Sequence, residues 1–229
     1  LMGAFATGFL LFGIALIYGA TATFNLAKIA SYISVSQAAG NTPMFVYAGV
    51  LLIMVGLLFK VSAAPFHFWA PDVYEGAPTV ITAFMATVVK TAAFAAFYRM
   101  FSTCFVEITG FWSNTMAIIA ASTMIGGNIL AVYQTSLKRM MAYSSIAHAG
   151  YMLMAIVAMN KISASSIFLY TASYSIASMG MFALMQAMTA SGDESVNSLK
   201  GLSKNNKGII VFISALVFSM AGIPPMAGF

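Results

Sequence analysis

Charged side chains are scarce in this sequence. They make up 7% of the 229 residues, against 61% hydrophobic residues, and the mean hydropathy is +0.93. A soluble domain cannot cover its surface with so few charges, so the composition excludes a soluble protein and predicts an all-α, polytopic membrane protein. The net charge of +5 comes from basic residues scattered singly in loops or apolar runs, which excludes a nucleic-acid interface. We expect the lipid bilayer to surround the protein.

Cysteine is almost absent as well. The single cysteine, Cys104, excludes a disulfide scaffold and a cysteine-based metal cluster. We therefore expect no metal site, and we interpret Cys104 as a small apolar residue near a helix end. The sequence also lacks an initiator methionine and a signal peptide, and it begins inside an apolar run. We expect it to be an internal fragment of a longer protein.

Long apolar runs fill most of the chain, and a membrane-spanning helix needs ~20 such residues. Residues 19–42 form a polar connection that can hold a short interfacial helix, and residues 102–112 are predicted to form a loop. Glycines at three positions of the first run predict close helix packing, at Gly3, Gly8 and Gly13. We expect about seven spans, at residues 1–18, 43–64, 78–101, 113–133, 140–159, 164–188 and from 209 onward.

Proline interrupts two of these spans. Pro65 removes a helical N–H and clashes one turn back, so the carbonyl of Val61 loses its helical partner. We predict that the second span runs to about residue 64 and continues as a half-helix over residues 66–74. Pro224 and Pro225 break the seventh span. Paired broken helices in corresponding places predict a transporter built from two repeats.

The polar connections indicate how the spans alternate. Trp69 and Tyr74 are typical of an aromatic belt at the membrane interface. Because successive spans cross the membrane in opposite directions, the connections at 65–77, 134–139 and 190–207 are expected to share one side of the membrane. That side carries more Lys and Arg than the other, which favours a cytoplasmic position for it.

Two lysines lie within or beside the apolar runs. Lys90 is near the middle of the third span, where ionisable side chains are costly and usually functional. Lys60 precedes the predicted break at Pro65, so it can either serve an ion path or extend along the helix to reach a headgroup. Together with His67, the lysines and the broken helix predict a proton or ion path through the membrane.

The fifth span has a polar face. Ser144, Ser145, His148 and Tyr151 share it, with Tyr143 nearby. These residues form either a hydrogen-bonded proton wire or a structural histidine satisfied by hydroxyls. Histidine titrates near neutral pH, which favours the wire. Packing favours the structural role, so both interpretations stay open. In the fourth span, Asn128 favours an interhelical hydrogen bond over a relay.

Three motifs resemble one known family, the antiporter-like membrane subunits of respiratory complex I, the proton-translocating NADH:quinone oxidoreductase. The Pro-Asp-Val-Tyr-x-Gly-Ala-Pro form of the first motif is similar to the N-type subunit, whereas L- and M-type subunits and Mrp-type antiporters carry other residues there. The resemblance covers essentially the whole chain. The motifs are KVSAAPFHFWAPDVYEGAP at 60–78, YSSIAHAGY at 143–151 and AGIPPMAGF at 221–229.

The resemblance implies an antiporter-like fold of about fourteen transmembrane helices with two inverted five-helix repeats, each containing one broken helix. This fragment would hold the sixth to twelfth helices, with residues 1–101 ending the first repeat and 113–229 forming most of the second. Lys60 would be the lysine of the first broken helix and Lys90 the lysine that leads to the second half-channel. The family's glutamate of the fifth helix would precede the fragment and its second broken-helix lysine would follow it, so the fragment alone should not pump.

The function implied is that of a membrane-arm subunit, which moves protons while partner subunits carry electrons from NADH to quinone. NADH, flavin, iron–sulfur clusters and quinone would bind to those partners, and no cofactor is expected in this chain. A lysine titrates near ~10.4 in water and burial disfavours its charged form, so the two lysines are expected to alternate between charged and neutral states. The expected relay residues are Lys60, Lys90, His67, His148 and Tyr143.

The partners implied are neighbouring antiporter-like subunits, and the location is a bacterial plasma membrane. Two other functions remain open. A Mrp-type cation/proton antiporter subunit would use the same lysines on a different ion. A scaffold of a related respiratory or hydrogenase complex would not transport at all, and its lysines would be dispensable.

Overall fold

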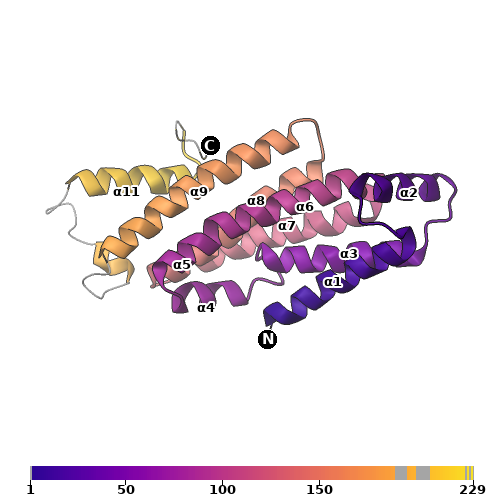
Figure 1. Ribbon diagram of the computed structural model, residues 1–229. Helices are drawn as coiled ribbons and strands as arrows, with labels where there is room; N and C mark the ends of the chain where they lie inside the picture. The colour runs from indigo at the N-terminus through magenta and orange to yellow at the C-terminus, as the bar shows by residue number, and fades with distance from the viewer. Residues whose placement is uncertain (1, 189–194, 200–206, 225, 227, 229) are drawn as a thin grey trace.

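A computed structural model describes residues 2–188, 195–199, 207–224, 226 and 228, and in these residues the regular structure is helical apart from one isolated bridge between Ser136 and Ser195. The helices run roughly alongside one another as an elongated bundle (Figure 1). Their bounds are α1 Met2–Thr21, α2 Leu26–Ala38, α3 Met44–Lys60, α4 Trp69–Gly76, α5 Thr79–Phe84, η1 Met85–Val89, α6 Lys90–Cys104, η2 Val106–Ile108, α7 Thr109–Val132, α8 Leu137–Ala158, α9 Ser163–Met188, η4 Val196–Leu199 and α11 Lys207–Met220.

Each of the seven predicted spans contains a helix. Within the part of the chain that the structure describes, five helical stretches are long and apolar enough to cross a membrane: α1, the continuous α5–η1–α6 helix, η2 with α7, α8, and α9. Helices α3 and α11 are apolar but shorter, at 17 and 14 residues. They are the two helices that the prolines were predicted to break.

The predicted loop at residues 102–112 is wrong for most of its length. Helix α6 continues to Cys104, a single 3-10 turn follows, and α7 begins at Thr109. The prediction gave weight to the polar residues of this stretch, but its aromatic residues decide the structure. Trp112 is fully buried, and its indole N–H donates to the carbonyl of Phe105 at 3.0 Å, which closes the turn between the two helices.

Helix α3 ends at Lys60, four residues before the predicted end. The N–H of Ser62 donates to the carbonyl of Phe59 at 3.1 Å. The N–H of Ala63 donates to the carbonyl of Leu58 at 2.9 Å, and Ser62 lies in the left-handed region at φ 61°. This is a Schellman motif, which closes a helix by giving its last carbonyls new partners. The helix is therefore complete before the proline, which belongs to the turn that follows.

Helix α11 ends with the same motif. The N–H of Gly222 donates to the carbonyl of Ser219, and the N–H of Ile223 donates to the carbonyl of Phe218. Gly222 lies in the left-handed region at φ 69°. Pro224 follows directly, as the sequence predicts, whereas Pro225 lies outside the described residues. The two short helices thus end in the same way, which is the local pattern expected of corresponding elements in two repeats.

Three connections meet at one end of the bundle. Arg139, at the start of α8, forms ion pairs with Asp72 and Glu75 of α4. The N–H of Val196 donates to the carbonyl of Thr135 at 2.9 Å. These contacts confirm that the three connections share a side, although most of the third lies outside the described residues. The cytoplasmic position of that side stays a prediction.

Helices α1 and α3, and helices α7 and α8, approach closely through glycines. A Cβ at Gly13 would lie 2.8 Å from the carbonyl oxygen of Gly49, and one at Gly127 would lie 2.7 Å from the backbone nitrogen of Ala147. The predicted packing role is therefore confirmed for Gly13. For Gly3 and Gly8 it stays a prediction, because a Cβ at either position would meet no described residue within 4 Å.

The short helix predicted between the first two spans is present as α2. It lies beside the end of α6, where the thiol of Cys104 contacts the carbonyl oxygen of Leu26 at 3.6 Å. Cys104 is buried, as expected for an apolar residue near a helix end. Tyr74 differs from its prediction, because it is 1% exposed and sits inside the bundle rather than in an interfacial belt.

Candidate functional site

Lys90 lies at the centre of the site. It is 3% exposed and follows the π-helical turn η1, a rare element that occurs frequently at functional sites. Its ammonium donates to the carbonyl oxygen of Ser145 at 2.8 Å and to the hydroxyl of the same residue at 2.5 Å. Among the described residues, no carboxylate forms an ion pair with Lys90. The buried cation therefore depends on neutral oxygen atoms.

Ser145 connects Lys90 to two tyrosines. Its side chain is 2% exposed, and the hydroxyls of Tyr74 and Tyr174 lie beside it. These four residues come from α6, α8, α4 and α9, so the contact exists only when all four helices are packed. The result is a buried cluster of one amine and three hydroxyls.

His148, one helical turn after Ser145, begins a second group of polar side chains. Its Nδ1 atom lies 2.7 Å from the hydroxyl of Tyr170, and its ring centroid lies 4.9 Å from that of Tyr174. Tyr151 packs edge-on against His148 and accepts a hydrogen bond from the side-chain amide of Asn128 at 2.8 Å. Asn128 thus makes the interhelical hydrogen bond that the sequence favours.

A cavity of about 670 Å³ borders this second group. Its walls combine the polar face of α8 with residues at the end of α11, including Met220 and Gly222. The broken end of α11 therefore reaches the histidine side of the site. The polar side chains that line the cavity are Asn128, Ser144, His148, Tyr151 and Tyr170.

Lys60 and His67 lie apart from this cluster. Lys60 is exposed at the end of α3 and borders a separate, largely apolar cavity of about 500 Å³ together with Trp69 and Val89. His67 is half-buried in the turn between α3 and α4, where its ring contacts Phe68. Lys60 and His67 each remain predicted relay residues, and the alternative that Lys60 extends toward a headgroup also remains.

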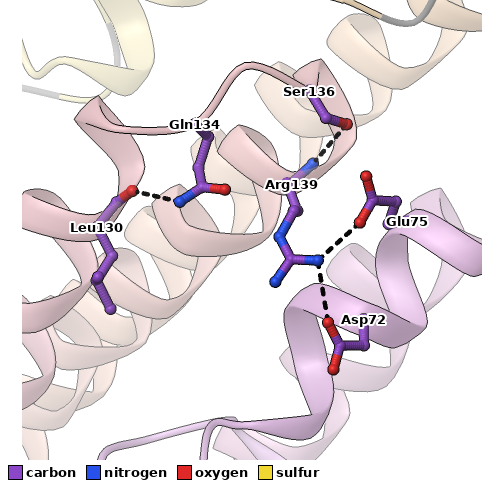
Figure 2. A network of polar contacts seen from close by, with 6 residues as sticks. All are labelled: Asp72, Glu75, Leu130, Gln134, Ser136 and Arg139. Carbon is purple, nitrogen blue, oxygen red and sulfur yellow. Dashed lines mark hydrogen bonds and ion pairs between the residues drawn. The ribbon is translucent and has the colours of Figure 1, made fainter.

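Tyr143 lies near Arg139 rather than near His148. Figure 2 shows the guanidinium of Arg139 between the two carboxylates of α4, at 2.8 Å from Glu75 and 3.1 Å from Asp72. The side chain of Ser136 accepts from the backbone N–H of Arg139 and caps α8. Tyr143 therefore lies toward this end of the bundle, and its relay role stays a prediction.

Sequence reasoning singled out Lys90 and His148 but missed what joins them. The tyrosines of α9 were not among the expected relay residues, and Tyr74 was interpreted as an interfacial aromatic. Their hydroxyl periodicity was a usable signal, since Tyr170 and Tyr174 lie one helical turn apart and face the same side. Among the described residues, no group of three His, Cys, Asp or Glu side chains could hold a metal ion. The absence of a cofactor stays a prediction.

All 229 residues match the family model described as NADH:quinone oxidoreductase/Mrp antiporter, transmembrane. The chain belongs to this family. It is a multi-pass membrane protein with an all-α, antiporter-like fold, as the sequence predicts. The total of fourteen helices and the division into repeats at 1–101 and 113–229 stay predictions.

Curated relatives are similar along the whole chain. NADH-quinone oxidoreductase subunit N of Cytophaga hutchinsonii is 45% identical over 230 residues, covering 100% of this chain and 49% of the relative. Subunit N 1 of Herpetosiphon aurantiacus is 45% identical over 233 residues, covering 100% and 48%. The chain thus spans about half the length of these relatives.

Solved structures share the fold. A chain of respiratory complex I from Thermus thermophilus with bound aureothin has a TM-score of 0.80 at 36% identity, covering 100% of this chain and 48% of that one. A chain of the Mrp complex from Dietzia sp. DQ12-45-1b has a TM-score of 0.86 at 25% identity, covering 98% and 41%. A chain of the membrane-bound sulfane sulfur reductase, an archaeal respiratory membrane complex, has a TM-score of 0.84 at 27% identity, covering 97% and 45%.

Proposed function

We propose that this chain is the central part of an N-type subunit in the membrane arm of an NADH:quinone oxidoreductase, where it translocates protons. The observation that carries the proposal is Lys90, a buried lysine in the middle of a membrane span whose ammonium rests on Ser145. A charged lysine at the centre of a bilayer costs about 2.5–3.5 kcal/mol or more, and such residues mark ion or proton paths.

The surroundings of Lys90 suit a proton rather than a metal cation. A sodium or potassium ion requires several oxygen ligands around an open centre, whereas the amine of Lys90 occupies the space between α6 and α8 and binds a proton itself. Hydroxyls and an imidazole, which can accept and donate protons, continue from it to the cavity beside His148. This path leads from Lys90 into the second half of the chain.

Electron transfer belongs to other subunits in this proposal. NADH, flavin, iron–sulfur clusters and quinone bind there, and this chain contributes to the enzyme as a translocase without a redox centre of its own. Its partners are the other membrane-arm subunits, including neighbouring antiporter-like ones. Because the relatives named above are bacterial proteins, we place the complex in a bacterial plasma membrane.

A Mrp-type cation/proton antiporter subunit is the second candidate. The likeness to the Dietzia Mrp chain, with a TM-score of 0.86, favours it on fold alone. The 45% identity to two subunits N outweighs that likeness, because sequence identity separates members that share one fold. Sodium-dependent transport without quinone reduction would support the antiporter.

The test is Lys90→Met in the full-length protein, assembled in its complex in inverted membrane vesicles. Methionine keeps the length and apolar body of the side chain and removes the amine. We expect NADH-driven proton uptake to be lost while the amount of assembled complex on native gels is unchanged. Full proton uptake by the assembled variant would overturn the proposal, and loss of assembly would assign Lys90 a packing role.

A further inference from the structure

The two hydrogen bonds from Lys90 end on atoms with different chemistry. The carbonyl oxygen of Ser145 can only accept, so a proton that reaches it goes no further. The hydroxyl of Ser145 has one donor and two lone pairs, so it can accept a proton while it releases its own. Of the two contacts, only the hydroxyl can pass a proton from Lys90 onward.

Tyr174 of α9 continues this route toward the cavity. Its hydroxyl lies beside the side chain of Ser145, and its ring lies 4.9 Å, centroid to centroid, from that of His148. Tyr174 and His148 line a small pocket together, and His148 also borders the large cavity. Tyr74 also contacts Ser145, but it lines neither the small pocket nor the large cavity.

We propose that the hydroxyl of Ser145 is the relay through which Lys90 exchanges its proton, with Tyr174 as the next carrier. An N–H bond of the ammonium breaks and an O–H bond forms at Ser145 Oγ, as the original Ser145 proton moves to the hydroxyl oxygen of Tyr174. Tyr174 releases its own proton to a water molecule in the small pocket that it lines with His148. One proton enters and one leaves, both hydroxyls end neutral, and Lys90 ends as the neutral amine. This inference rests on the proposed function and adds a residue to it.

The test compares Ser145→Ala with Ser145→Thr in the full-length protein, in assembled complex in inverted vesicles. Alanine keeps the carbonyl contact and removes the relay, whereas threonine keeps the hydroxyl. Positioned proton transfer contributes ~10²–10⁴-fold in enzymes, so we expect S145A to lower proton uptake at least ~tenfold and S145T to retain most of it. The control is Ser175→Ala, which removes another interhelical hydroxyl, 3.2 Å from that of Thr91, and should leave uptake unchanged.

Three results separate the two proposals. If Lys90→Met abolishes uptake and S145A does not, the relay is wrong and the proposed function stands. If S145A and S145T lose uptake equally in assembled complexes, Ser145 serves packing and the relay is again overturned. If S145A does not assemble, Tyr174→Phe decides: reduced uptake in an assembled complex supports the relay, and normal uptake refutes it.

Discussion

Two lysines beside apolar runs occupy opposite environments in this chain. Lys90 is enclosed and hydrogen bonded by Ser145, whereas Lys60 is exposed at a helix end. The difference arises because α5–η1–α6 continues past Lys90, while the Schellman motif stops α3 directly after Lys60. The same residue type is therefore buried in the bundle in one case and faces outward in the other.

Replacing Lys60 tests whether its exposed position still serves the proton path. We expect Lys60→Ala to lower NADH-driven proton uptake and NADH:quinone turnover together in fully assembled complex, because its amine lies at the broken end of α3 beside a cavity that Val89 also borders. The matched control is Lys161→Ala, another exposed lysine at the α8–α9 connection. Unchanged uptake and turnover in the Lys60 variant would make that residue a headgroup contact and leave the function to Lys90.

Hydropathy was enough to identify Lys90 as a buried residue, since a span of ~20 apolar residues fixes the depth of its centre. It could not identify Ser145 as the partner, because that contact depends on how α8 is rotated against α6. The same limit explains Tyr74. Tyr74 was predicted to lie in an interfacial aromatic belt, but packing of α4 against α8 buries it.

At the scale of elements, the contact between α7 and α8 depends on one of two adjacent glycines. Gly127 faces the backbone of Ala147, whereas a Cβ at Gly126 would meet nothing within 4 Å. We expect Gly127→Ala to destabilise the protein by about 1–3 kcal/mol, the usual cost of overpacking. Gly126→Ala should be neutral or slightly stabilising, because alanine favours helix over glycine.

The measurement for this pair is the thermal unfolding midpoint of the purified full-length protein in detergent. Both variants add the same single methyl group to the same helix, so they differ only in the face that receives it. Equal midpoints for the two would contradict the packing of α7 on α8 described here. The sequence showed both glycines, but only the rotation of α7 decides which one matters.

Element ends were harder to predict than elements. Each predicted span contains a helix because hydrophobic length is a strong signal. The predicted end of α3 was one turn too late, because the left-handed Ser62 closes the helix before Pro65 is reached. The stretch at 102–112 was misjudged because buried aromatic residues, including Trp112, outweigh its polar ones.

At the scale of the whole molecule, Arg139 joins the two halves of the chain. It connects α4, which follows the first broken helix, to α8, which carries Ser145 and His148. The contact lies at the end of the bundle, so it can hold α4 against α8 without entering the membrane interior. Sequence alone predicted only that the two connections share a side.

The two ion pairs should contribute unequally. Glu75 lies closer to Arg139 than Asp72 does, and its side chain is 39% exposed against 73%. In double-mutant cycles with Arg139→Ala, we expect a coupling energy of ~0.2–1 kcal/mol for Glu75, as for exposed pairs elsewhere, and less for Asp72. Both couplings, measured from unfolding midpoints, should fall as salt rises. A larger coupling for Asp72, or no effect of salt, would contradict this assignment.

The buried thiol of Cys104 makes the α2–α6 contact visible to chemistry. It is the single cysteine of this chain, and its sulfur lies under the carbonyl of Leu26. A membrane-permeant maleimide can react with it only while α2 is lifted from α6. The rate at which Cys104 is labelled therefore measures how often α2 separates from α6, and no cysteine has to be introduced.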